Sequence, residues 1–139
     1  MLWRRSINGQ AYLEFLFVLP LLLLIIAGVV GFGQLLYTKL AVEAAAWASA
    51  REGIATLNQG RGLGQSYLAA RYTLDGFGLN PEHAQQYMKI WGQWQRGTQL
   101  RARVCYRVPA PPVPLGSLFL PSTICASETL PIYQWKSKW

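Results

Sequence analysis

Residues 10–37 read QAYLEFLFVLPLLLLIIAGVVGFGQLLY, and this stretch decides the fold of the chain. From Phe15 to Gly33 no side chain is charged or able to form a hydrogen bond, and the apolar run resumes after Gln34. The hydrocarbon core of a bilayer is about 30 Å thick, which an α-helix crosses with about 20 residues. The sequence therefore predicts one membrane-spanning helix over residues 15–37.

The charges on either side of this span predict its orientation. Arg4 and Arg5 precede it with no acidic residue before Glu14, whereas the basic residues that follow it are balanced by acidic ones. Positively charged flanks remain in the cytoplasm. We therefore expect a cytoplasmic N-terminus and export of the residues after the span.

Glu14 places a carboxylate at the edge of the apolar segment, where an ionisable group is costly. In a plain membrane anchor this side chain would simply reach toward the headgroups. A second interpretation starts from Gly9, because cleavage after it would remove a short basic leader, residues 1–9, and make Gln10 the new N-terminus. The free α-amine of one subunit and Glu14 of its neighbour would then neutralise each other in an apolar assembly.

A basic leader, a glycine, four residues, a glutamate and a long apolar helix together resemble the class III prepilin signal. More closely, GQAYLEFLFVLPLLLL at residues 9–24 and FGQLLYTKLAVEAAAWASAREG at residues 32–53 resemble the TadE-like pseudopilins of tight-adherence (Flp-type) pilus systems. The features that carry the resemblance are Gly9, Glu14 followed by Phe15, the Leu-Pro pair ending at Pro20, and the alanine-rich stretch that ends in Arg-Glu-Gly.

This resemblance implies cleavage between Gly9 and Gln10 by a prepilin peptidase of the bacterial inner membrane. It implies a periplasmic C-terminal domain and a minor pilin or pseudopilin that takes part in pilus assembly, priming or tip formation. Glu14 and Phe15 would serve assembly. The implied partners are other pilins and pseudopilins of the same system and its inner-membrane assembly platform, and the chain would stay in the membrane or enter the extracellular pilus.

The sequence divides into the leader, a long helix over residues 10–53 and an exported domain over residues 54–139. Pro20 removes a backbone hydrogen bond and predicts a kink in the helix. The stretch Leu40–Arg51 is rich in alanine, and small side chains allow helices to approach closely. We expect this stretch to pack against other pilin helices.

The exported domain is expected to contain two short helices. Residues 56–65, TLNQGRGLGQ, are predicted to form a linker or turn because glycine and polar residues dominate. Apolar residues at helical spacing predict a helix from Leu63 to Asp75. Asn80 and Pro81 are typical of a helix start. The second helix should end near Gly97, and the residues on its apolar face are Ala84, Tyr87, Met88 and Trp91.

From Thr98 to Val108 the apolar residues recur at every second position, which predicts a strand. Pro109 ends it, and residues 109–121, PAPPVPLGSLFLP, are predicted to form a stiff loop. A second β segment is expected at residues 122–131. The predicted fold class is therefore α+β and pilin-like, with a long N-terminal transmembrane helix, short helices and a small antiparallel sheet.

The two cysteines, Cys105 and Cys125, both belong to the exported part, where an even pair forms a disulfide. Strand parity places both on the same side of an antiparallel pair of strands. This register would set Tyr106 opposite Ile124 and Leu100 opposite Leu130. It would also set Ala102 opposite Glu128, an acidic residue on the apolar face.

The residues contain no catalytic set, no metal-ligand cluster and no phosphate-binding loop, so we expect neither an enzyme nor a bound cofactor or metal. Two rival interpretations stay open. One is a single-pass anchored structural protein that does not enter a fibre. The other is a DNA-binding minor pilin of an uptake pilus that uses Arg101, Arg103 and Arg107. A solvated sheet face is the preferred account of these arginines, and nucleic acid is not the expected partner.

Overall fold

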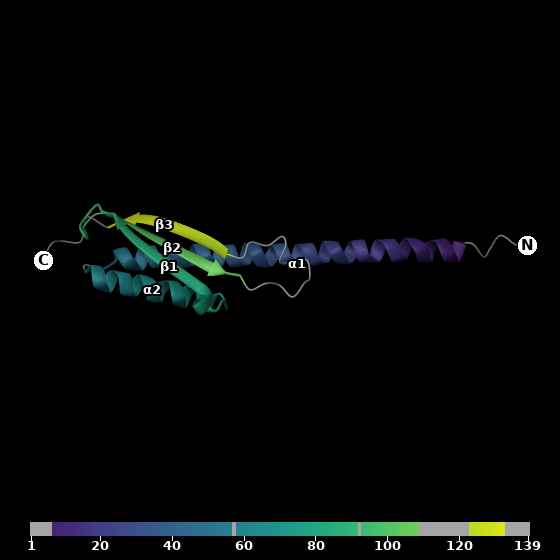
Figure 1. Cartoon of the computed structure of the whole chain (residues 1–139), viewed down its shortest axis with the longest axis horizontal. Helices are drawn as coiled ribbons and strands as arrows, with labels where there is room; N and C mark the ends of the chain where they lie inside the picture. The colour runs from purple at the N-terminus through teal and green to yellow at the C-terminus, as the bar shows by residue number, and fades with distance from the viewer. Residues whose placement is uncertain (1–6, 57, 92, 109–122, 133–139) are drawn as a thin grey trace, which may run out of the picture. The chain divides into compact units, whose positions relative to one another are not determined.

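A computed structural model describes residues 7–56, 58–91, 93–108 and 123–132. The described elements, in chain order, are α1 (Ile7–Ile54), α2 (Gln59–Gly76), the 3₁₀ turn η1 (Pro81–His83), β1 (Ala84–Trp91), β2 (Gln99–Arg107) and β3 (Thr123–Pro131) (Figure 1). One long helix, a second helix and a three-stranded antiparallel sheet confirm the α+β prediction. The loop predicted at residues 109–121 lies outside the described residues.

The chain forms two compact units, residues 1–35 and residues 36–139, and the boundary falls within α1. In the first unit, every described side chain from Ala11 to Val30 is exposed. The helical segment Ala11–Ile54 is long and apolar enough to cross a membrane. Pro20 lies inside α1, which continues on both sides of it, and the kink stays a prediction.

In the second unit, one face of α1 is buried, and its residues recur at intervals of three and four. The members of this face are mostly small: Thr38, Ala41, Val42, Ala45, Ala46, Ser49, Ala50, Gly53 and Ile54. The expectation that the alanines of this stretch pack against other pilin helices is wrong for this face, because the chain's own second unit already buries it. Small side chains here allow α1 to approach its own domain closely.

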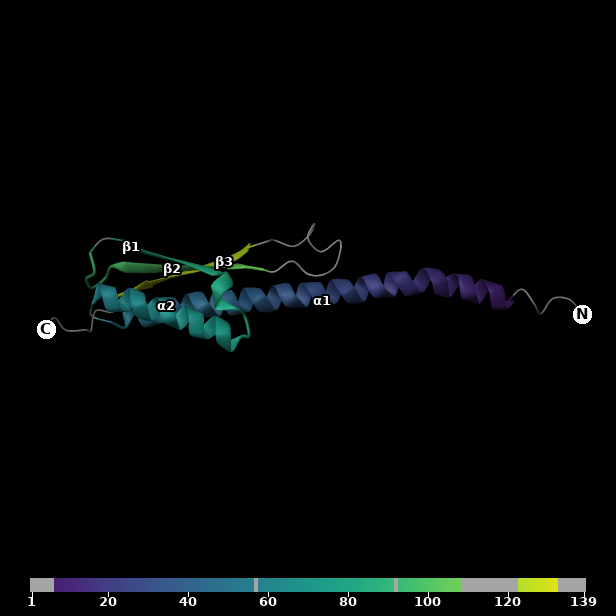
Figure 2. The ribbon, with the colours of Figure 1, turned by 60° about the horizontal axis from the view of Figure 1, so that its bottom comes forward.

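The main core of the second unit joins three elements. Val42 and Ala46 of α1 cluster with Leu74 of α2, and with Val104 and Tyr106 of β2. A second cluster holds Ile54, Leu100 and Ile132. The sheet thus lies on one side of this unit, and α2 with the C-terminal part of α1 lies on the other (Figure 2).

Helix α2 begins earlier than the sequence predicts. Asn58 caps it by accepting a hydrogen bond from the Gly60 N–H at 3.0 Å. The linker predicted at residues 56–65 is therefore wrong beyond Asn58. Gly62 explains the difference, because it is buried beside Trp94 and Thr56, where a larger residue would not fit. Packing, rather than turn formation, accounts for this glycine.

The helix predicted from Asn80 to Gly97 is also wrong, except at its start. Asn80 does cap a turn and Pro81 does occupy its first position, but the turn η1 ends at His83. The next residues form β1, which pairs antiparallel with β2 from Ala84 opposite Tyr106 to Trp91 opposite Gln99. Pairing with a neighbouring strand outweighs the helical spacing of a short apolar pattern.

The sheet has the order β1-β2-β3, and both pairings are antiparallel. The predicted register of β2 and β3 is confirmed, with Cys105 opposite Cys125 and Leu100 opposite Leu130. Ala102 does lie opposite Glu128. The acidic residue is half-buried and lies on an edge strand.

Candidate functional site

The bond between Gly9 and Gln10 lies within the first turn of α1, which begins at Ile7. The first turn of a helix lacks partners for its N–H groups, and glycine disfavours the helical conformation by about 1 kcal/mol relative to alanine. This turn therefore unwinds at lower cost than the interior of α1.

Glu14 and Phe15 both lie exposed on α1, with 60% of Phe15 accessible. Residues three and four positions away are the neighbours of a helical side chain. For Glu14 these include Ala11, Phe17 and Val18, none of which is charged. No other residue in the described part of the chain forms an ion pair with Glu14.

In the second unit, a further surface of α1 points away from the core, and we call it the outer helix face. Its residues recur at intervals of three and four: Leu36, Leu40, Glu43, Trp47 and Arg51. Leu40 is 61% exposed and Trp47 is 49% exposed. The two charged members of this face also form contacts. Glu43 pairs with Lys39 at 3.8 Å. The Arg51 guanidinium lies 5.0 Å from the Trp47 ring centroid.

Tyr37 connects α1 to the turn that follows α2. Its hydroxyl donates a hydrogen bond to the carbonyl of Phe77 at 3.0 Å, and the two rings meet edge to face with centroids 5.8 Å apart. This contact attaches the beginning of the second unit's helix to the rest of that unit. The Tyr37–Phe77 contact therefore holds the outer helix face in place within the second unit.

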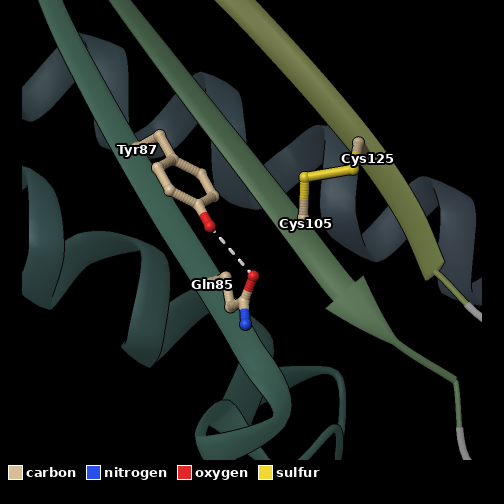
Figure 3. The surroundings of a disulfide bond; sticks show 4 residues. All are labelled: Gln85, Tyr87, Cys105 and Cys125. Carbon is tan, nitrogen blue, oxygen red and sulfur yellow. Dashed lines mark hydrogen bonds between the residues drawn. A yellow bond between two sulfur atoms is a disulfide. The ribbon is translucent and has the colours of Figure 1, made fainter.

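The predicted disulfide joins Cys105 of β2 to Cys125 of β3 (Figure 3). The Cys105 side chain is almost fully buried and Cys125 is exposed. Gln85 of β1 is the cross-strand neighbour of Cys105, and it accepts a hydrogen bond from the Tyr87 hydroxyl at 3.0 Å. The disulfide thus connects an edge strand to the central strand on the face away from the core.

The sequence pattern misses three described members of this face. It predicts a helix for Gln85, Tyr87 and Lys89, whereas β1 places them opposite Cys105, Arg103 and Arg101. The alternation of exposed residues with half-buried Met88 and Ile90 was the available signal, and it was too short to outweigh the helical pattern. Among the described residues, no group of three or more His, Cys, Asp or Glu side chains is placed to hold a metal ion.

The searches of curated proteins and of solved structures each found no match to this chain. A scan against family models gave one match, which covers the segment that holds Gly9, Glu14, Phe15 and Pro20. Residues 9–51 match the family model described as TadE-like protein, which confirms the predicted resemblance and identifies this N-terminal segment as TadE-like.

Proposed function

We propose that this chain is a minor pilin-like subunit of a tight-adherence pilus. It is cleaved between Gly9 and Gln10, is held in the bacterial inner membrane by residues 15–37 and assembles through α1. The observation that carries the proposal is the TadE-like match over residues 9–51, which includes the glycine and the glutamate of the prepilin-type signal. The proposal assigns the chain no catalytic activity and no cofactor.

The environment of Glu14 supports assembly with other subunits. A carboxylate whose neighbours three and four positions away on its own helix carry no charged side chain gains little from its own chain. In an apolar assembly a free α-amine close to it would be strongly attracted, because the effective dielectric constant is low. Cleavage after Gly9 creates such an amine at Gln10, four residues before the carboxylate of each subunit.

The exposed apolar surface of α1 supports the same role. In the first unit, all described side chains from Ala11 to Val30 are exposed. In the second unit, the outer helix face exposes Leu36, Leu40 and Trp47. Membrane lipid would cover residues 11–30. Neighbouring subunit helices would cover these residues and the outer helix face as well. The partners are other pilins and pseudopilins of the same system, the prepilin peptidase and the inner-membrane assembly platform.

The disulfide supports export of residues 54–139 to the periplasmic side. Disulfides persist in oxidising compartments and are rare in the cytosol. The chain closes one between Cys105 and Cys125, separated by 20 residues. This agrees with the orientation expected from Arg4 and Arg5.

The mature N-terminus tests the proposal. Mass spectrometry of protein from cells with an active prepilin peptidase should find a chain that begins at Gln10, and from peptidase-deficient cells a chain that retains residues 1–9. Gly9→Arg should block cleavage, because the peptidase must accept the backbone at this position closely. The matched control Asn8→Arg adds the same charge one residue earlier and should still be cleaved.

A precursor that keeps its leader in the presence of the peptidase would favour the rival anchor that never enters a fibre. Co-purification provides a second test of the proposal. Cleaved protein should bring other pilins of the system with it from detergent extracts, whereas an anchor of the rival kind would not.

A further inference from the structure

The face of the sheet that points away from the core is strongly basic. Its exposed residues alternate with the core residues along all three strands. We call it the basic face, and its members are Gln85, Tyr87, Lys89, Gln99, Arg101, Arg103, Cys105, Arg107, Thr123, Cys125, Ser127, Thr129 and Pro131. Four of these are cations and none carries a carboxylate, whereas the acidic residue of β3, Glu128, belongs to the opposite face.

The cations of this face stand close together. Lys89 lies directly opposite Arg101 in the pairing of β1 and β2. Arg103 follows Arg101 on the same side of the strand, about 7 Å further along. Like charges directly opposite each other destabilise a sheet. An anionic ligand would be attracted to this group of cations.

Polar groups capable of hydrogen bonding lie on both sides of the central arginines. Ser127 of β3 accepts a hydrogen bond from the Arg101 Nη2 at 3.3 Å, which orients the guanidinium across the sheet. Along the same edge strand, Thr129 lies two positions after Ser127 and Thr123 lies four positions before it. On the other edge, the Tyr87 side chain is 57% exposed and its hydroxyl is held by Gln85.

We propose that the basic face binds an acidic polysaccharide, that is, a polymer of sugars that carry carboxylate groups. The planar guanidinium groups of Arg101, Arg103 and Arg107 match carboxylates with two parallel hydrogen bonds each. The hydroxyl groups of β3 pair with sugar hydroxyls. The ring of Tyr87 offers an apolar surface to the C–H face of a sugar and keeps its polar end in water.

The same observations disfavour two other occupants, and the DNA arm of the test below distinguishes nucleic acid from a polysaccharide. A lipid surface is held by apolar side chains that insert between headgroups, and the described cations here are flanked by polar residues instead. A second copy of this chain carries the same net charge of +7 and is repelled at long range.

The test uses the full chain in phosphatidylcholine nanodiscs, with polygalacturonate as the probe. The triple variant R101Q/R103Q/R107Q should weaken binding about tenfold or more, and the affinity of the unaltered chain should fall as salt is raised. The matched control K39Q/R61Q/R71Q removes the same formal charge from helices α1 and α2 and should change binding less than about twofold. Thermal unfolding of the triple variant should change little, because substitutions at exposed positions usually alter stability by less than about 0.5 kcal/mol.

Two further measurements distinguish recognition of the sugar from attraction to its negative charge. Polygalacturonate with its carboxylates methyl-esterified should bind far more weakly than the acid form. Y87A should lower affinity for polygalacturonate several-fold and leave the weak binding of duplex DNA unchanged. Equal losses in both triple variants, equal binding of the esterified polymer, or DNA binding as tight as polysaccharide binding would each overturn the proposal. None of these outcomes bears on the pilus role, which depends on α1.

Discussion

Gly53 of α1 lies so close to Ser66 of α2 that a Cβ atom added to the glycine would collide with the serine Oγ. The same added atom would lie 2.6 Å from Cδ2 of Leu100 in β2. Glycine is therefore what allows α1, α2 and the sheet to meet at this point. Both Ser66 and Leu100 are fully buried, so neither side chain has free space into which it can move.

Gly53→Ala should destabilise the second unit by about 1–3 kcal/mol, because a methyl group is forced into a filled site. Gly64→Ala in α2 is the matched control, since nothing lies within 4 Å of its Cβ position. It should stabilise the protein by up to about 1 kcal/mol, because alanine favours helix. Thermal unfolding of the full chain in detergent micelles measures both, and equal melting temperatures for the two variants would contradict this packing.

The link between Cys105 and Cys125 predicts a large effect of its removal. The double variant Cys105→Ser with Cys125→Ser should lose about 3 kcal/mol of unfolding free energy, because its unfolded chain is no longer constrained by a closed loop. Peptide mapping of the unaltered protein without reductant should recover the linked peptides. Reduction of the unaltered protein should reproduce the stability of the double variant, and free thiols at both positions in native protein would refute the pairing.

Glu14→Ala should leave membrane insertion and cleavage after Gly9 intact, because removing a charge eases insertion. Co-purification of partner pilins should fall sharply, since breaking a buried ion pair costs about 3–5 kcal/mol. Glu52→Ala provides the control, because this exposed acidic residue lies at the far end of the same helix. Unchanged partner yield from Glu14→Ala would show that the carboxylate has no role in assembly.

The outer helix face predicts a variant that separates assembly from folding. Leu40→Gln should reduce co-purification of partner pilins while the unfolding free energy stays within about 0.5 kcal/mol, because Leu40 is 61% exposed. Tyr72→Gln on α2, where the tyrosine is 73% exposed, changes a comparable apolar surface elsewhere and should not affect partner yield. If both variants lose partners equally, the effect is one of general surface hydrophobicity.

Some elements follow from local sequence pattern alone. The apolar run from Phe15 to Gly33 predicts the helix because its length matches a bilayer and no polar group interrupts it. The alternation that contains Cys105 predicts both the strand and its partner register, because side chains on a strand repeat every two residues and a one-residue slip would reverse every face. The confirmed pairing of Leu100 with Leu130 rests on that parity.

Tertiary structure decided what local pattern leaves ambiguous. Residues 84–91 satisfy a helical spacing, yet they form β1 because pairing with β2 satisfies their backbone groups. Gly62 resembles a turn residue in the sequence, but it lies in α2 where Trp94 leaves no room for a side chain. The alanines of α1 indicate close helix packing, but they do not specify what packs against them. The three-dimensional arrangement shows that the chain's own core covers that face. Sequence period specifies which side chains share a face, whereas the contacts between distant segments determine what each face meets.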